Sequence, residues 1–358
     1  MADLRIGIIG TGGIAHAHLR NYNAIEGVEV VAGCDIVPGK AAEFFKNNNM
    51  PATQAFDSAA EMLDAVELDA VSVCTYAAAH AECTILALEH GLPVLLEKPM
   101  CVTLDEAKAI VAAEKKSGKF VTIGFQPRYD PNAQHVKEII ASGVLGDIYY
   151  IQTGGGRPRD VPPALSFLRK ETAGAGSCSD AGCYPLDFAL NSVGYPKPLT
   201  VSATLVTNFA NKPKYTPFAD QLDVDDFSSA YVRLEGGIVL DYRMSWVMHM
   251  DTAGDFIFLG TEAGLKIKQP GPVGAWDGPI GSITLFKQED DGSLSQTAIE
   301  MKEASEDIWM RKIKDFVDAV RDGKNIAPIP TAEVIYNQAI IDGMIRSGTL
   351  GREVECEF

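Results

Sequence analysis

A glycine-rich turn near the start of the sequence constrains the fold more than any other feature. The run Leu4–Ile9 is apolar and rich in β-branched residues, as in a buried parallel strand. It leads into residues 10–15, GTGGIA, which match the pattern G-x-G-x-x-A. Such glycines let the backbone turn sharply and approach a pyrophosphate at the N-terminus of the next helix. We therefore expect four residues of this turn to bind a dinucleotide: Gly10, Gly12, Gly13 and Ile14.

An acidic residue follows at the distance that a dinucleotide-binding unit requires. The second apolar run, Val28–Cys34, ends in Asp35, roughly 20 residues after the turn, where a carboxylate binds the ribose hydroxyls. The alternative is an ordinary strand–helix–strand unit with an unrelated Asp. Asp35 would repel a 2′-phosphate, and Ile36 and Val37 add no cation directly behind it. The sequence therefore favours NAD, although Lys40 leaves NADP open.

The pattern of elements changes near the middle of the chain. Strand-like and helix-like runs alternate to about residue 125, which predicts an α/β Rossmann domain with a doubly wound parallel sheet over residues 1–125. Short strand-like runs separated by turn residues follow, with Glu235-Gly236-Gly237 as a hairpin turn. They predict an α+β domain over residues 126–358, with a large, mostly antiparallel open sheet. We expect this domain to bind substrate and its exposed sheet face to mediate oligomerisation.

A charged pair ends one of the predicted buried strands. Pro93–Leu96 is followed by Glu97, Lys98 and Pro99. The carboxyl ends of strands in such a sheet face the ligand crevice. Because desolvation favours the neutral amine, a Lys at this place is a candidate proton handler. The alternative is a solvated Lys in a strand-to-helix turn.

The overall charge and composition exclude several classes of partner. The net charge of −17 argues against a nucleic-acid surface and against an anionic membrane surface. No apolar run approaches the ~20 residues of a membrane helix, and the first residues lack the pattern of an export signal. The seven cysteines are scattered without paired metal spacing. We expect a cytoplasmic protein that binds no nucleic acid, membrane or metal.

Taken together, several motifs resemble the Gfo/Idh/MocA oxidoreductases, a family that includes glucose–fructose oxidoreductase, inositol dehydrogenase and dihydrodiol dehydrogenase. The motifs are the glycine turn, Thr75 with His80 behind it, Glu97-Lys98-Pro99, and Gly124-Phe125-Gln126-x-Arg128. The resemblance implies an NAD(P)-dependent enzyme and a homodimer or homotetramer formed through the C-terminal sheet. It also implies these further cofactor contacts: Thr75, Tyr76, His80, Glu97, Lys98 and Gln126.

A second family motif falls within residues 173–187. Asp180 and Asp187 match it, and Tyr184 stands where many members have His and some have Tyr. The resemblance implies that Tyr184 and Lys98 exchange the proton, while Asp180 orients a substrate hydroxyl or Lys98. The helical spacing of Asp180 and Tyr184 predicts that they share one face. The alternative for Tyr184 is a core residue at a helix start, and for Asp187 we expect a structural role.

Three further residues are candidates for substrate contacts. Arg128 and Arg157 suit a carboxylate or phosphate, and the alternative is that both are solvated. The ring of Trp246 suits the apolar face of a sugar, and the alternative is a place in the core or an interface. For His18 we expect a buried, hydrogen-bonded residue rather than a ligand.

These features predict an NAD(P)-dependent oxidoreductase that transfers a hydride between nicotinamide and a secondary alcohol or carbonyl of a sugar, cyclitol or related polyol. Two alternatives stay open. One is a hydrolase of the same fold that uses NAD for transient oxidation during glycosidic-bond cleavage. The other is a non-catalytic NAD(P)-binding regulator, which would not need Lys98 or Tyr184.

Overall fold

The chain folds into two compact units in the computed structural model, which describes residues 4–156, 161–250, 254–268 and 280–358. The first unit comprises Met1–Gln126 and Glu306–Ile335, and the second comprises Pro127–Ser305 and Tyr336–Phe358. The predicted boundary between residues 125 and 126 therefore misses the return of residues 306–335 to the first unit. We describe each unit by itself.

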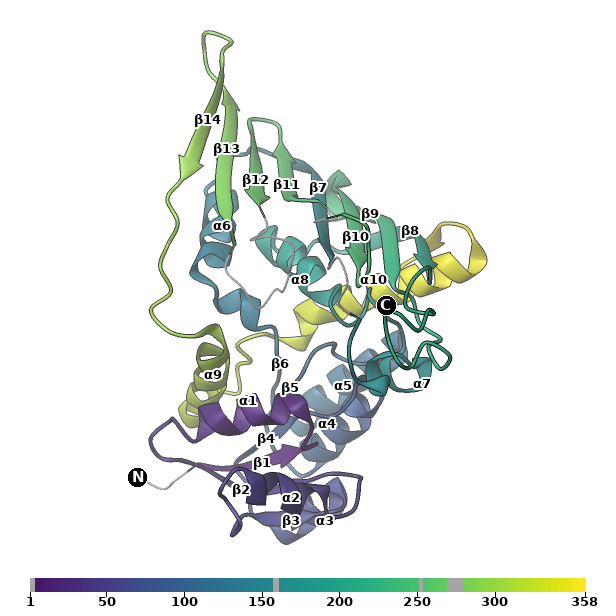
Figure 1. The fold of residues 1–358 in the computed structure, drawn as a ribbon. Coiled ribbons are helices and arrows are strands. Elements are labelled where there is room, and N and C mark those ends of the chain that lie inside the picture. Colours follow the sequence, from purple (N-terminus) through teal and green to yellow (C-terminus); the bar gives the residue numbers. More distant parts are fainter. Residues whose placement is uncertain (1–3, 157–160, 251–253, 269–279) are drawn as a thin grey trace. The chain divides into compact units, whose positions relative to one another are not determined.

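The first unit contains a six-stranded parallel sheet in the order β3-β2-β1-β4-β5-β6 (Figure 1). This is the predicted doubly wound arrangement, in which the strand order reverses between β1 and β4. The strands are β1 (Leu4–Ile9), β2 (Val28–Cys34), β3 (Gln54–Phe56), β4 (Ala70–Val73), β5 (Val94–Leu96) and β6 (Val121–Ile123).

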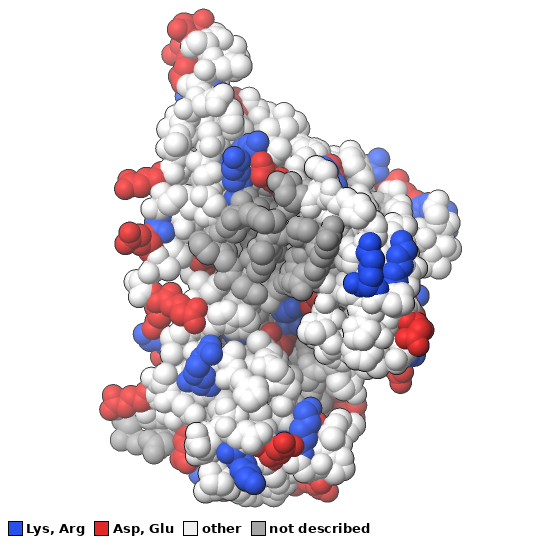
Figure 2. Space-filling model, in the orientation of Figure 1, with Lys and Arg blue, Asp and Glu red and all other residues white. Residues whose placement is uncertain are grey.

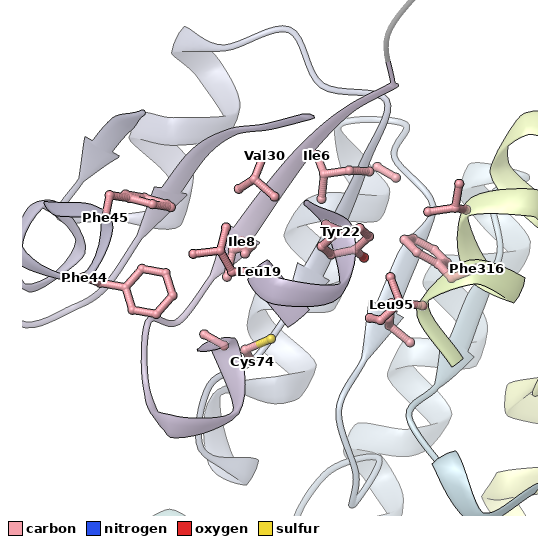
Figure 3. Close-up of a cluster of buried hydrophobic side chains, with 14 of the residues drawn as sticks. Ile6, Ile8, Leu19, Tyr22, Val30, Phe44, Phe45, Cys74, Leu95 and Phe316 are labelled. Carbon is pink, nitrogen blue, oxygen red and sulfur yellow. The ribbon is translucent and has the colours of Figure 1, made fainter. Parts of the chain in front are cut away.

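Helices connect these strands and cover the sheet. They are α1 (Gly13–Tyr22), α2 (Lys40–Asn47), α3 (Ala59–Ala65), α4 (His80–Glu89), α5 (Leu104–Ser117) and, from late in the sequence, α9 (Ile308–Asp322). Side chains of α1, α2 and α9 form one buried cluster with β1, β2, β4 and β5, and Figure 3 shows Phe316 beside Tyr22 and Leu95 in it. Burial of each large apolar side chain is worth about 1.5–3 kcal/mol, so α9 is an integral layer of this unit.

The second unit contains a nine-stranded sheet in the order β14-β13-β12-β11-β7-β10-β9-β8-β15 (Figure 1). Only β7 and β10 pair in parallel; every other neighbouring pair of these described strands is antiparallel. The predicted large, mostly antiparallel sheet is thus confirmed. The strands are β7 (Ile148–Gly156), β8 (Pro198–Val206), β9 (Phe227–Leu234), β10 (Val239–Ser245), β11 (Phe256–Gly260), β12 (Ala263–Lys268), β13 (Ser282–Gln288), β14 (Leu294–Ile299) and β15 (Val354–Glu355).

Two helices pack against one face of this sheet in the described residues, α8 (Cys183–Ser192) and α10 (Thr331–Leu350), which begins in the first unit. The unit also contains α6 (Pro131–Ala141), which packs against α8, and the single turn α7 (Lys170–Ala173). Phe188 of α8 makes edge contacts with Phe256 and Phe258 of β11, at ring-centroid distances of 4.9 and 6.2 Å. The α8 helix is therefore fixed on the sheet by an aromatic core.

The sheet of the second unit contains one hairpin turn that the sequence predicts and one hairpin that it does not. The predicted turn at Glu235–Gly237 is present, and Gly236 and Gly237 both have positive φ angles, 79° and 80°. The hairpin of β13 and β14 was not predicted, because β14 is polar and its Leu294 is 82% exposed. Figure 2 shows acidic side chains at the tip of this hairpin, where the sequence has Glu289, Asp290 and Asp291.

Candidate active site

The glycine turn lies at the point where the strand order of the first unit reverses. Gly10 follows β1 with a φ angle of +88°, and a Cβ atom there would lie 2.8 Å from the backbone of Cys74 and Thr75. An L side chain fits neither that backbone conformation nor that space. Glycine at position 10 therefore allows the backbone after β1 to pass close to the backbone after β4. The ligand crevice of this fold lies at this point, where the strand order reverses.

The N-terminus of α1 presents backbone hydrogen-bond donors to this crevice. Gly12 is the N-cap and provides no side-chain cap, and the first turn of α1 carries no acidic residue. A Cβ atom at Gly12 or Gly13 would have no heavy atom within 4 Å, so the space beside the turn is open. Backbone N–H groups and the helix dipole make such an end a site for a pyrophosphate. Ile14, the fourth predicted residue, packs partly buried against the core cluster.

Asp35 lies at the carboxyl end of β2 as predicted. Its carboxylate accepts hydrogen bonds from the Thr11 amide (2.9 Å), the Thr11 hydroxyl (3.0 Å), the Val37 amide (3.1 Å) and the Lys40 ammonium (2.8 Å). Burial raises the pKa of Asp35, but these hydrogen bonds outweigh burial and lower it overall. Asp35 is thus an ionised acceptor beside the glycine turn, and Lys40 is paired with it.

The segment after β4 contributes a hydroxyl that suits a ligand. The Oγ1 atom of Thr75 is buried and has no hydrogen-bond partner in the described structure. A buried polar atom without a partner is costly and often marks a ligand position. Tyr76 is 40% exposed next to it. The open helix end, Asp35 and the Thr75 hydroxyl together fit a dinucleotide.

His80 connects two predicted cofactor-binding segments. Its Nδ1 lies 2.7 Å from the carbonyl oxygen of Pro99, and its Nε2 lies 3.1 Å from the carbonyl oxygen of Thr75. The ring is 1% exposed, and burial lowers its pKa. His80 therefore ties the end of β4 to the segment after Lys98, and its direct contact with a cofactor stays a prediction.

Glu97 and Lys98 at the end of β5 have different surroundings. Glu97 is 3% exposed, and its carboxylate is bonded to His18 and Lys312 inside the first unit. Lys98 is half-buried, and its peptide bond to Pro99 is cis. Gln126, the last residue of the first unit, is fully buried. His18 is buried and hydrogen-bonded, as its sequence position suggested, whereas the cofactor contacts of Glu97, Lys98 and Gln126 stay predictions.

The second unit holds Tyr184 at the start of α8. Tyr184 is 8% exposed, and its amide bonds to the carbonyl oxygen of Ala181 at 3.4 Å. Asp180 lies in the turn before the helix, where its amide bonds to Gly176. The prediction that Asp180 and Tyr184 share a face of one helix was therefore wrong, because α8 begins only at Cys183. The catalytic roles of both residues stay predictions.

A buried carboxylate that sequence reasoning missed holds this turn. Asp225 accepts hydrogen bonds from the Gly176 amide (2.8 Å), the Ser177 hydroxyl (2.7 Å) and the Cys178 amide (3.2 Å), and burial raises its pKa. A Cβ atom at Gly176 would lie 1.9 Å from the Asp225 carbonyl oxygen. The sequence signal was the acidic pair Asp225-Asp226 directly before an apolar strand, since carboxylates at such places bind backbone amides.

Of the remaining predicted substrate residues, one is ion-paired, one is buried and one lies outside the described residues. Arg128 forms a two-point ion pair with Asp187 in the second unit. Trp246 is fully buried, as in the core alternative, so its contact with a sugar stays a prediction. Arg157 is outside the described residues.

Comparison with known proteins places the chain in a family. Residues 4–125 match the family model described as "Oxidoreductase family, NAD-binding Rossmann fold", and residues 133–266 match the model of the GFO/IDH/MocA C-terminal domain. The two models together cover most of the chain. The chain belongs to the Gfo/Idh/MocA family. It is accordingly an oxidoreductase with an NAD-binding Rossmann domain, as predicted.

Individual relatives of this Gfo/Idh/MocA protein carry the names of dehydrogenases. D-glucoside 3-dehydrogenase of Escherichia coli (strain K12) is 27% identical over 99% of the chain and 98% of that protein. Inositol 2-dehydrogenase of Paracoccus denitrificans is 34% identical over 44% of the chain and 46% of that protein. Levoglucosan dehydrogenase, solved in complex with NADH, has a TM-score of 0.81 at 20% identity, with 99% of both chains covered, which shows a common fold.

Two kinds of feature are absent from the described residues of this Gfo/Idh/MocA protein. No group of three or more His, Cys, Asp or Glu side chains among them is arranged to hold a metal ion. None of their helices has the length and apolar character needed to span a membrane.

Proposed function

We propose that this protein is a dehydrogenase that transfers a hydride between NAD and a secondary alcohol or carbonyl of a sugar, cyclitol or related polyol. The observation that carries the proposal is the dinucleotide cradle, which combines the open N-terminus of α1, the ionised Asp35 and the unpartnered Thr75 hydroxyl. The substrate class comes from the glucoside dehydrogenase relative, which matches almost the whole chain.

Oxidation of an alcohol removes a hydride from carbon and a proton from oxygen. Bound NAD would accept the hydride. We propose that Tyr184 exchanges the proton and that the Lys98 ammonium stabilises the phenolate formed when the Tyr184 proton leaves. Asp180 would orient the substrate hydroxyl. These roles are supported by the resemblance of Lys98 and Asp180 to positions of the family motifs, and by Tyr184, which stands where many members have His and some have Tyr.

A substrate panel tests the reaction. Purified protein is incubated with NAD and with glucosides, inositols or aldoses, and reduced nicotinamide is followed by its absorbance. We expect NADH to form with at least one polyol or sugar. Cleavage of a glycosidic bond without net NADH would instead establish the NAD-dependent hydrolase, and cofactor binding without any turnover would favour the regulator.

Substitutions test the residues. Lys98→Met and Tyr184→Phe are each expected to reduce kcat by about 100-fold or more, while NAD binding measured by calorimetry changes little. Matched controls are Lys108→Met and Tyr149→Phe, since Lys108 has a 37% exposed side chain and Tyr149 is 51% exposed. A loss of activity smaller than about threefold in Lys98→Met would reject its role in proton transfer.

We also propose a cytoplasmic location and a homodimer or homotetramer formed through the open sheet of the second unit. On β9 the residues Ala230 and Val232 are buried while Tyr231, which points to the other face, is 44% exposed. Light scattering of Tyr231→Glu tests the interface, and an unchanged oligomeric mass would place it elsewhere.

A further inference from the structure

A buried ionic cluster lies beneath the end of β5 in the first unit. Glu97 is 3% exposed, Lys312 of α9 is 2% exposed and His18 of α1 is fully buried. The Lys312 ammonium and the His18 Nε2 atom both bond to Oε1 of Glu97, the latter at 2.8 Å. Lys312 Nζ also lies 3.4 Å from His18 Nε2. Buried charges are costly unless they are paired and hydrogen-bonded, as these are.

The protons of this cluster can be arranged so that each contact from Tyr22 through Ser72 and His18 to Glu97 is a hydrogen bond. Burial lowers the pKa of His18, so its ring is neutral and donates through one nitrogen only. Nε2–H then donates to Glu97, and Nδ1 accepts from the Ser72 hydroxyl at 3.0 Å. The Ser72 oxygen in turn accepts from the Tyr22 hydroxyl at 2.7 Å. The network therefore joins β4, the end of β5, α1 and α9, and each contact between Tyr22, Ser72, His18 and Glu97 pairs one donor with one acceptor.

Lys312 supplies the charge that keeps Glu97 ionised. Burial raises the pKa of Glu97, but the Lys312 charge and the hydrogen bonds from His18 and Lys312 more than offset burial and hold the pKa well below its usual range. The pair is thus one anion and one cation with a neutral imidazole beside them. If Lys312 were removed, the Glu97 carboxylate would be left buried and uncompensated.

The cluster reaches the backbone of Lys98 directly. The Lys98 amide points to Oε2 of Glu97 at 3.4 Å. On the other side, a Cβ atom at Gly124 would lie 2.9 Å from Oε1 of Glu97, so glycine leaves the room that the carboxylate occupies. A change in the orientation of the Glu97 side chain would therefore also move the backbone at Lys98.

We propose that Lys312 is a positioning residue for Lys98, which anchors the Glu97 carboxylate and so holds the end of β5 in the geometry that hydride transfer requires. This inference rests on the proposed catalytic role of Lys98. Lys312 lies on a helix that joins the first unit from the far end of the sequence, and the motif Glu97-Lys98-Pro99 does not contain it. A shift of about 1 Å at a reacting group can cost about 100-fold in rate.

Kinetics of Lys312→Met test the proposal. We expect kcat to fall by about tenfold to 100-fold while the KM for NAD changes by less than about threefold. Activity is expressed per folded molecule, with the folded fraction taken from circular dichroism. The matched control is Lys314→Met on the same helix, since Lys314 has a 48% exposed side chain, and it should keep parental kinetics.

The double variant Lys312→Met/Glu97→Gln distinguishes a loss of kcat caused by misplacement of Lys98 from one caused by an uncompensated buried charge. It also tests the proposal if the single variant Lys312→Met does not fold. With both charges removed, thermal stability should recover while kcat stays at least about tenfold low, because the neutral amide side chain at position 97 no longer has its anchor. A folded single or double variant with kcat within twofold of the parent would overturn the proposal. If Lys98→Met is inactive and the Lys312 variants are normal, only this inference fails. An active Lys98→Met would instead reject the proposed role of Lys98 in proton transfer, on which this inference rests.

Discussion

Arg128 and Asp187 of the second unit form a two-point ion pair, in which the Arg128 Nε and Nη2 atoms each lie 2.9 Å from a different carboxylate oxygen. The side chains are only 10% and 4% exposed. The Tyr195 hydroxyl bonds to both residues, and the guanidinium lies 5.0 Å from the centre of the Tyr195 ring. Asp187 thus has the structural surroundings expected for it, and Arg128 is bound to Asp187.

The first prediction is that Arg128 acts mainly on stability. Because Arg128→Met leaves the buried Asp187 carboxylate without its cation, the free energy of unfolding should fall by about 3–5 kcal/mol in urea denaturation. The KM for the sugar or polyol should stay within about threefold in the folded enzyme. A large rise in this KM with unchanged stability would show instead that Arg128 binds substrate, as the sequence suggested.

The second prediction concerns the choice between NAD and NADP. In Asp35→Ala the repulsion of a 2′-phosphate disappears and the Lys40 ammonium loses its partner, so it becomes available to that phosphate. We expect the ratio of kcat/KM for NAD to that for NADP to fall by about tenfold or more. Adding Lys40→Met should reverse most of the gain with NADP. An unchanged ratio in Asp35→Ala would reject the contact with the ribose.

The third prediction contrasts two glycines of one turn. Gly10→Ala places a side chain at a φ angle of +88° and against the backbone of Cys74 and Thr75, so unfolding should become easier by about 1–3 kcal/mol or more. Gly12 has a φ angle of −81° and open space around its Cβ position, so Gly12→Ala should fold normally. Its methyl group would occupy the space of the pyrophosphate, and NAD binding by calorimetry should weaken. Normal NAD binding by folded Gly12→Ala would contradict the proposed cradle.

Local signals explain which parts of the fold could be predicted from the sequence. The bounds of α5 follow from signals in the sequence, because Thr103 and Glu106 form a capping box and Gly118 ends the helix with a φ angle of 66°. The Rossmann strands and the glycine turn were likewise specified by short-range patterns. The edge strand β14 carries no such pattern, since its sequence LSQTAI is polar and largely exposed.

The candidate site was predictable only where a motif lies within one short segment. The glycine turn and Asp35 belong to such a motif. Lys312 could not be found in this way, because a lysine on an amphipathic helix is normally solvent-facing, and its burial depends on Glu97 from a distant segment. The error over Asp180 has a similar origin, because the turn that Asp225 holds delays the start of α8.

The last prediction is that the free energy of unfolding decreases as the pH is lowered into the mildly acidic range, because two buried histidines become protonated on unfolding. Burial lowers the pKa of His18 and His80 in the folded state below the ordinary histidine value of 6.5. Below pH 6.5 these two histidines therefore become protonated in the unfolded chain before they do so in the folded chain. The free energy of unfolding that they contribute above pH 6.5 is consequently lost as the pH falls. Each such group contributes up to about 1.4 kcal/mol per pH unit.

Urea denaturation between about pH 7.5 and 5.5 measures this effect. The free energy of unfolding should decrease over this range, and the decrease should be smaller in His18→Gln than in the parent. His16→Gln is the matched control, since His16 lies on the same helix with an exposed side chain, and its slope should equal that of the parent. Equal slopes in all three proteins would show that folding does not lower the proton affinity of His18. A steeper decrease in His18→Gln than in the parent would mean that His18 is protonated in the folded chain, and its Nδ1 would then donate to Ser72 instead of accepting from it.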